Sequence, residues 1–105
     1  MNIYNRSSII EFYKKHADCK ETLEKWYHDV SSKVWKKPSD VTRDFNTART
    51  AGNNRVIFKI NENNYRLIAE VNYQKGWLYI KFLGTHAAYD KVNAETVDMY
   101  RPKNK

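Results

Sequence analysis

The residues best suited to chemistry follow an apolar segment near the end of the chain. Residues 80–84 have the composition of a strand, and residues 85–90, with the sequence Thr-His-Ala-Ala-Tyr-Asp, come directly after it. A strand fixes the direction in which the chain leaves a sheet, so we expect the side chains of His86, Tyr89 and Asp90 to lie close together. Histidine exchanges protons near neutral pH, and tyrosine can donate a proton or stack on a base. The cluster therefore predicts proton transfer at a strand end.

Cationic side chains on the preceding strands indicate the substrate of such a cluster. Cleavage of RNA without a metal needs a base for the 2′-hydroxyl, cations beside the phosphorane and an acid for the departing 5′-oxygen. Arg66, Lys59 and Lys81 could supply the charge, and the histidine could be the acid or the base. Each cation also has a structural interpretation, because Arg66 can pair with Glu70 and exposed lysines often contribute little. Both interpretations stay open from the residues alone.

The overall charge favours the same class of partner. The chain carries 19 Lys and Arg against 12 Asp and Glu, and the resulting net charge of +7 attracts polyanions. The excess is spread over both halves, so charge alone does not locate a site. The sequence has no Gly-rich phosphate loop, no paired-cysteine metal spacing and no His-Glu-x-x-His helix. We therefore expect neither a metal nor another cofactor.

Length and cysteine content set the class of protein. The 105 residues are enough for one domain with one modest core, so we expect a single domain over residues 1–105. The lone Cys19 excludes an internal disulfide and fits a reducing compartment. No segment has the apolar length of a signal peptide or of a bilayer-spanning helix. A cytoplasmic location without a membrane partner is the expectation.

Hydrophobic periodicity predicts an α+β fold, with two helices packed on one face of an antiparallel sheet. Helical spacing favours helices over 7–17 and 20–35, after a very short strand at 3–4. The segment 38–45 begins with a proline and predicts a short helical turn or an ordered loop. From residue 54 the period changes to two, which indicates strands over 55–60, 65–73 and 77–83.

Alternation along these strands assigns their side chains to two faces. The face expected beneath the helices holds Val56, Phe58, Ile60, Leu67, Ala69, Val71, Leu78, Ile80 and Phe82. The opposite face holds Arg55, Ile57, Lys59, Arg66, Ile68, Glu70, Trp77, Tyr79, Lys81 and Leu83. Because that second face mixes cations with aromatic rings, it suits single-stranded RNA, and we expect RNA contacts from Arg55, Lys81, Trp77 and Asp90. The assignment depends on register, since a slip of one residue exchanges the faces.

The order of elements and four short motifs resemble the HigB branch of the RelE-type toxins of toxin–antitoxin systems. The motifs are Trp35-Lys36-Lys37-Pro38 and residues 54–60, 64–69 and 83–90. The resemblance implies a RelE-like fold and an mRNA interferase, which cleaves translated messages in the ribosomal A site and inhibits translation. It also implies silencing by a helix-turn-helix antitoxin of the HigA type.

The same resemblance assigns roles to individual residues. Arg66 and His86 match the family's catalytic positions best, and Lys59, Tyr89 and Asp90 match further site positions. The histidine departs from the Lys- and Arg-dominated site of RelE itself, so the division between base and acid stays open. Asp90 can orient an imidazole or accept a hydrogen bond from Arg66.

Two other functions are compatible with the sequence. One is a non-catalytic toxin on the same scaffold that acts on a protein such as DNA gyrase, as the ParE relatives do. The other is a plain RNA-binding module, for which the basic aromatic face would suffice. Codon preference, the antitoxin contact surface and oligomeric state do not follow from the sequence.

Overall fold

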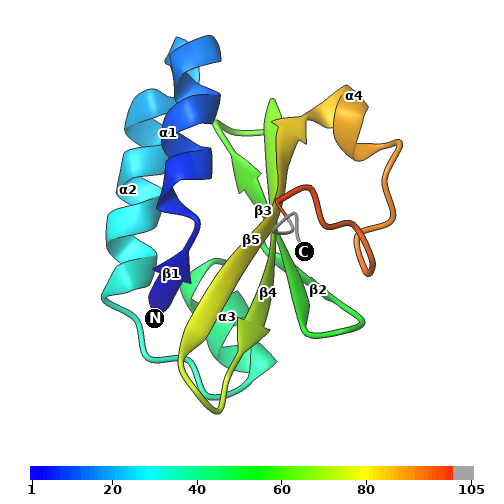
Figure 1. Cartoon of the computed structure of the whole chain (residues 1–105). Coiled ribbons are helices and arrows are strands. Elements are labelled where there is room, and N and C mark those ends of the chain that lie inside the picture. Colours follow the sequence, from blue (N-terminus) through cyan, green and yellow to red (C-terminus); the bar gives the residue numbers. More distant parts are fainter. Residues whose placement is uncertain (101–105) are drawn as a thin grey trace, which may run out of the picture.

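A five-stranded sheet carries the fold in the computed structural model, which describes residues 1–100 (Figure 1). The last five residues of the expected domain lie outside the described residues. The helical elements are α1 (Arg6–Lys15), the 3-10 turn η1 (Ala17–Cys19), α2 (Lys20–Ser31), α3 (Pro38–Asp44) and α4 (His86–Tyr89). The strands are β1 (Asn2–Tyr4), β2 (Arg49–Ala51), β3 (Arg55–Ile60), β4 (Tyr65–Asn72) and β5 (Trp77–Thr85).

The strand order β1-β5-β4-β3-β2 confirms the α+β class and adds two details. The sheet is mixed rather than wholly antiparallel, because β1 pairs parallel to β5 while the other neighbours are antiparallel. The strand β2 was not predicted. It forms a hairpin with β3 through a turn in which Asn53 and Asn54 both have positive φ.

Both long helices are present, but α2 ends four residues before the expected boundary. At its end, the Ser31 and Ser32 hydroxyls donate to backbone carbonyls of the last turn, at 2.7 Å each. Such serine bonds favour helix termination over continuation. Val34, which the expected helix 20–35 would have included, lies beyond the end of α2, and its side chain is 72% exposed. The segment 38–45 resolves into the helix α3, with its proline in the first turn.

The main core lies between the helices and one face of the sheet. Ile9 from α1 and Leu23, Trp26 and Val30 from α2 are buried in one cluster with the inward side chains of β3, β4 and β5. Trp26 meets Phe58 of β3 edge-to-face, with ring centroids 5.3 Å apart. The helices are held to the sheet mainly by this apolar burial. None of the helices among residues 1–100 combines the length and apolarity that crossing a bilayer requires.

A β-bulge at Lys81 changes the faces of the last strand. Ile80 lies opposite Ala69 and Phe82 lies opposite Ile68, so Lys81 is the extra residue in β5. Beyond the bulge the alternation is inverted. Two face assignments are therefore wrong: Phe82 belongs to the outward face and Leu83 to the main core.

The outward face is covered by a second, smaller core. Ile57, Ile68 and Phe82 are buried there, at 4% exposure or less, beneath apolar side chains of residues 89–97. Figure 1 shows the segment after α4, in orange and red, returning to the sheet. The Met99 N–H donates to the carbonyl of the bulged Lys81, at 2.8 Å. Part of the face expected to meet RNA is thus occupied by the chain itself.

Arg55 anchors this returning segment. Its side chain is 6% exposed, and the guanidinium donates to the carbonyls of Ala94 and Val97, at 3.2 and 2.7 Å, and pairs with Glu70 at 3.4 Å. A buried arginine needs such partners, because a buried charge without them is costly. The expected RNA contact from Arg55 is corrected accordingly: the side chain serves the fold and is not presented to solvent.

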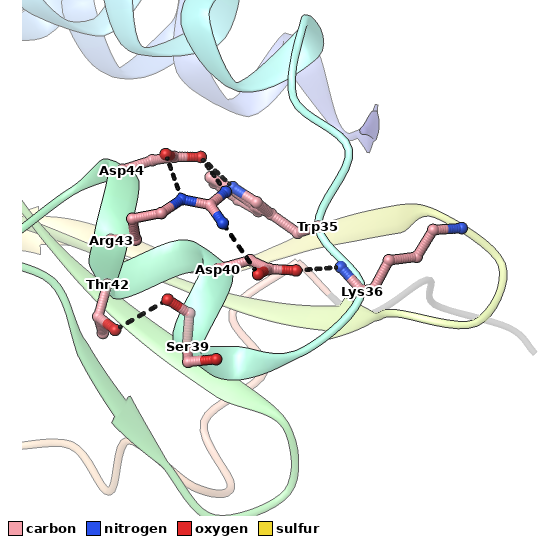
Figure 2. Close-up of polar contacts among 7 residues, drawn as sticks. All are labelled: Trp35, Lys36, Ser39, Asp40, Thr42, Arg43 and Asp44. Carbon is pink, nitrogen blue, oxygen red and sulfur yellow. Dashed lines mark hydrogen bonds and ion pairs between the residues drawn. The ribbon is translucent and has the colours of Figure 1, made fainter.

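A polar network fixes the loop between α2 and α3 (Figure 2). The indole N–H of the buried Trp35 donates to Asp44 at 2.8 Å, and Arg43 donates to Asp44 and Asp40 at 3.1 and 3.2 Å. The Lys36 N–H donates to the other oxygen of Asp40. The hydrogen bonds from Arg43 and from Trp35 lower the pKa of Asp44 from 3.8 to about 2.

Replacing Gly84 with alanine should destabilise the fold through the second core. A Cβ on Gly84 would stand 2.7 Å from the ring of Phe82, which would have to leave its buried position. Overpacking of this kind costs about 1–3 kcal/mol. Urea unfolding of the variant measures the change in unfolding free energy.

The matched control is Gly52→Ala, whose Cβ meets only the flexible carboxylate of Glu95. This variant should stay within about 0.5 kcal/mol of the parent, as exposed substitutions usually do. Equal stabilities for the two variants would contradict the described packing around Gly84.

Replacing Asp44 with asparagine should change the acid sensitivity of the fold. Because the folded-state pKa is lowered, the carboxylate contributes stability above about pH 4, and the contribution is lost as pH falls toward 2. The stability difference between parent and variant, from urea unfolding at each pH, should therefore shrink over that interval. Arg43→Ala should show part of the effect, because the bond from Trp35 remains. A difference independent of pH would contradict this assignment.

Candidate active site at the end of strand β5

The site begins where β5 runs into α4. Thr85 is the N-cap of that helix, and its Oγ1 accepts a hydrogen bond from the Ala88 N–H at 3.1 Å. The His86 N–H donates to the Asn64 carbonyl, also at 3.1 Å, which ties the start of α4 to the turn between β3 and β4. A helix of four residues is not stable by itself. These two bonds and the packing of Tyr89 hold it in place.

His86 and Asp90 form a pair across one helical turn. The distance from Nδ1 of His86 to Oδ2 of Asp90 is 3.2 Å, and the two side chains are 45% and 59% exposed. When Nδ1 carries the proton, it donates to the carboxylate, and Nε2 is then the nitrogen available for proton exchange. Of the two roles open to Asp90, the geometry shows contact with the imidazole.

Tyr89 is the centre of the cluster. Its ring packs on the second core, 6.4 Å from the His86 ring and 5.4 Å from the guanidinium of Arg66. Its hydroxyl accepts a hydrogen bond from Nη2 of Arg49, at 2.7 Å. The phenol is thus held by cations from two strands, β2 and β4, that are far apart from it in the sequence.

Sequence reasoning missed Arg49 because it missed the strand that carries it. The signal was present in Gly52-Asn53-Asn54, since a pair of asparagines after a glycine favours the positive φ of a tight hairpin turn. Reading that turn would have placed a short strand before β3. Arg49 would then have faced the same side of the sheet as Ile57, its partner in the register.

Arg66 lies deeper than expected. It is only 6% exposed and donates to the Asn63 carbonyl and amide oxygens, at 3.1 and 2.7 Å, and to the Tyr65 carbonyl, at 3.3 Å. It does not pair with Glu70, which instead meets Arg55. Alternation assigns Arg66 to the face expected to meet RNA, and that expectation is corrected: its charge is buried beneath the ring of Tyr89.

The remaining predicted residues divide into two sets. Lys59 is exposed and lies opposite Arg66 in the register of β3 and β4, close to the cluster. Lys81 is 20% exposed and pairs with Asp98 at 3.3 Å. Trp77 lies at the other end of β5 from His86, on the outward face as expected. The structure therefore groups Arg66, His86, Tyr89, Asp90 and Lys59, and leaves Arg55, Lys81 and Trp77 apart.

This arrangement combines the groups needed for acid–base work on an anion. An exposed imidazole provides proton exchange, a phenol provides a stacking surface or a proton, and guanidinium groups provide positive charge beside both. Among residues 1–100, no three His, Cys, Asp or Glu side chains are grouped so that they could hold a metal ion.

Comparison with known proteins identifies the family. A family model for HigB toxins, described as the RelE-like toxic component of a toxin–antitoxin system, matches residues 19–92. The match spans more than two thirds of the chain and includes the four central and edge strands β2 to β5 and the cluster on α4. No curated protein in the comparison matches the chain. The resemblance inferred from the motifs is thereby confirmed, and the chain belongs to the HigB family of RelE-like toxins.

Proposed function

We propose that this toxin is a metal-independent endoribonuclease, an mRNA interferase that cleaves translated messages on the ribosome and so inhibits translation. The observation that carries the proposal is the exposed pair of His86 and Asp90 beside Tyr89, with cationic groups around it. The family is the RelE-like toxic component of a toxin–antitoxin system, and the resemblance of the motifs to RelE-type mRNA interferases supports the chemistry.

Different residues of the cluster carry out the proton transfers and stabilise the charge of the phosphate. The 2′-hydroxyl oxygen attacks the adjacent phosphorus, its proton passes to a base, and the bond to the 5′-oxygen breaks as that oxygen gains a proton from an acid. Nε2 of His86 performs one of these proton transfers, with Asp90 orienting the ring. Arg49 and Lys59 meet the phosphate oxygens from the exposed side, and Arg66 adds positive charge from beneath Tyr89.

Dependence on the ribosome has a physical reason. His86 and Asp90 are about half exposed, so the toxin alone excludes little water from the reacting groups. Such groups gain most when another scaffold holds the ribose and phosphate in line for attack. The activity would then lie in the cytoplasm, where translated messages are found. A helix-turn-helix antitoxin would inhibit the toxin.

His86→Ala should lower the rate of message cleavage by about 10²- to 10⁴-fold, the usual contribution of one general acid or base. Because the side chain is partly exposed and outside both cores, the variant should fold normally. The measurement is the mapping of new RNA ends in a translation reaction with purified ribosomes.

The matched control is His28→Ala, an exposed histidine on α2, which should cleave at the parental rate. Parental cleavage by the His86 variant would refute the assigned role. Growth arrest with DNA damage and without cut messages would refute nuclease action altogether and favour a gyrase-directed toxin.

A further inference from the structure

Three aromatic rings form a row on the outward side of β5 and β1, at the end of the sheet away from α4. Trp77 and Tyr79 are stacked, with centroids 6.2 Å apart and an interplanar angle of 18°. Tyr79 lies beside Tyr4 in the parallel register, with centroids 5.8 Å apart. Trp77 is 37% exposed and Tyr4 is 47% exposed. We call Trp77, Tyr79 and Tyr4 the aromatic row.

A hollow adjoins the row. Its volume is about 280 Å³, and it is lined by Tyr4, Asn5, Tyr79, Ile80, Lys81 and Tyr100. That volume lies just below the range of about 300–1,000 Å³ typical of small-molecule sites. The ammonium of Lys81 lies 5.8 Å from the centre of the Tyr79 ring and 3.3 Å from Asp98. The hollow thus combines ring faces, an amide side chain and a cation.

Two features of this surface distinguish it from ordinary exposed strand. Exposed hydrophobic side chains that are grouped, unlike single scattered ones, mark interaction sites, and of the four large ones exposed among residues 1–100, two belong to the row. Residues 89–97 of the returning segment pack on Ile57, Ile68 and Phe82, whereas Tyr4 and Trp77 stay exposed and Tyr100 forms one wall of the hollow. The open part of the outward face is therefore its aromatic part.

We propose that the aromatic row and its hollow bind unpaired bases of single-stranded RNA. Ring faces stack on bases of any sequence, and an amide can pair with a base edge. The net charge of +7 favours this occupant over an apolar peptide. The proposal rests on the proposed function and extends it: Tyr79 is six residues before Thr85, the last residue of β5, or roughly 20 Å along the strand at about 3.3 Å per residue, and His86 follows Thr85 directly. One RNA strand can then contact both places.

The test measures the affinity for RNA in the absence of cleavage. The probe is a single-stranded 12-nucleotide RNA with 2′-O-methyl riboses, which cannot be cut through the 2′-oxygen. In the parent, its binding should quench tryptophan emission, because Trp77 is exposed while Trp26 and Trp35 are at most 4% exposed. Fluorescence anisotropy of labelled probe then gives the Kd for each variant.

Tyr79→Ala and Trp77→Ala should each raise the Kd by about 5- to 150-fold, the range expected when one stacked base is lost. Tyr79→Leu keeps most of the side-chain volume but has no aromatic ring, so it controls for loss of packing. Its Kd should rise as much as that of Tyr79→Ala. Tyr79→Phe should bind as the parent does. Tyr27→Ala is the matched control, since this ring lies on α2 against Arg6, and it should leave the Kd unchanged.

The outcomes separate this proposal from the nuclease proposal. If binding depends on Tyr79 and Trp77 but the parent does not cleave messages on ribosomes, the RNA-binding role of the aromatic row is supported and only the nuclease proposal is refuted. If cleavage depends on His86 but the Kd is unchanged in the Tyr79 and Trp77 variants, only the RNA-binding role of the aromatic row is refuted. The row is also overturned if the probe does not bind, or if binding leaves the tryptophan emission unchanged.

Discussion

One inserted residue in β5 determines how the outward face of the sheet is used. The bulge at Lys81 turns Phe82 away from the helices, where it joins Ile57 and Ile68 and creates an apolar patch that must be covered. It also leaves the Lys81 carbonyl free to accept the Met99 N–H. The chain after α4 is thereby drawn back over the sheet.

The candidate site depends on this second core. Tyr89 packs on it from α4, and from that position the ring contacts Arg66 below and Arg49 beside it. The short helix α4 has little stability by itself, so the capping by Thr85 and the packing of Tyr89 together fix the direction of His86. The geometry of the candidate site is thus set by tertiary packing and not by the strand alone. Within residues 1–100, the same packing leaves Tyr4 and Trp77, at the far end of β5, exposed.

Local patterns in the sequence predicted most of the fold but not the placement of its charges. The apolar spacing of Leu23, Trp26 and Val30 and the alternation up to Ile80 identified the helices and the main core, because these features depend on neighbours in the chain. The inversion after Lys81 followed from a bulge, for which the strand interior offered only Gly84 as a signal.

The burial of Arg55 and Arg66 could not be predicted in this way. It depends on contacts with Ala94 and Val97, 39 and 42 positions after Arg55, and with Tyr89, 23 positions after Arg66, and alternation within a strand carries no information about such contacts. The clustering of His86, Tyr89 and Asp90 was predictable because one strand and one helical turn place them. Arg49, by contrast, lies on the edge strand β2, and only the residues of the turn after this strand indicate it in the sequence.

The chemical identity of the RNA ends is the most direct test of the central claim, that the cluster on α4 cuts RNA through its 2′-hydroxyl. Messages cleaved in a translation reaction with the purified toxin can be examined by mass spectrometry of the fragments. The mechanism predicts a 2′,3′-cyclic phosphate or a 3′-phosphate on one fragment and a 5′-hydroxyl on the other. Fragments with 5′-phosphate and 3′-hydroxyl ends, or intact messages, would contradict it.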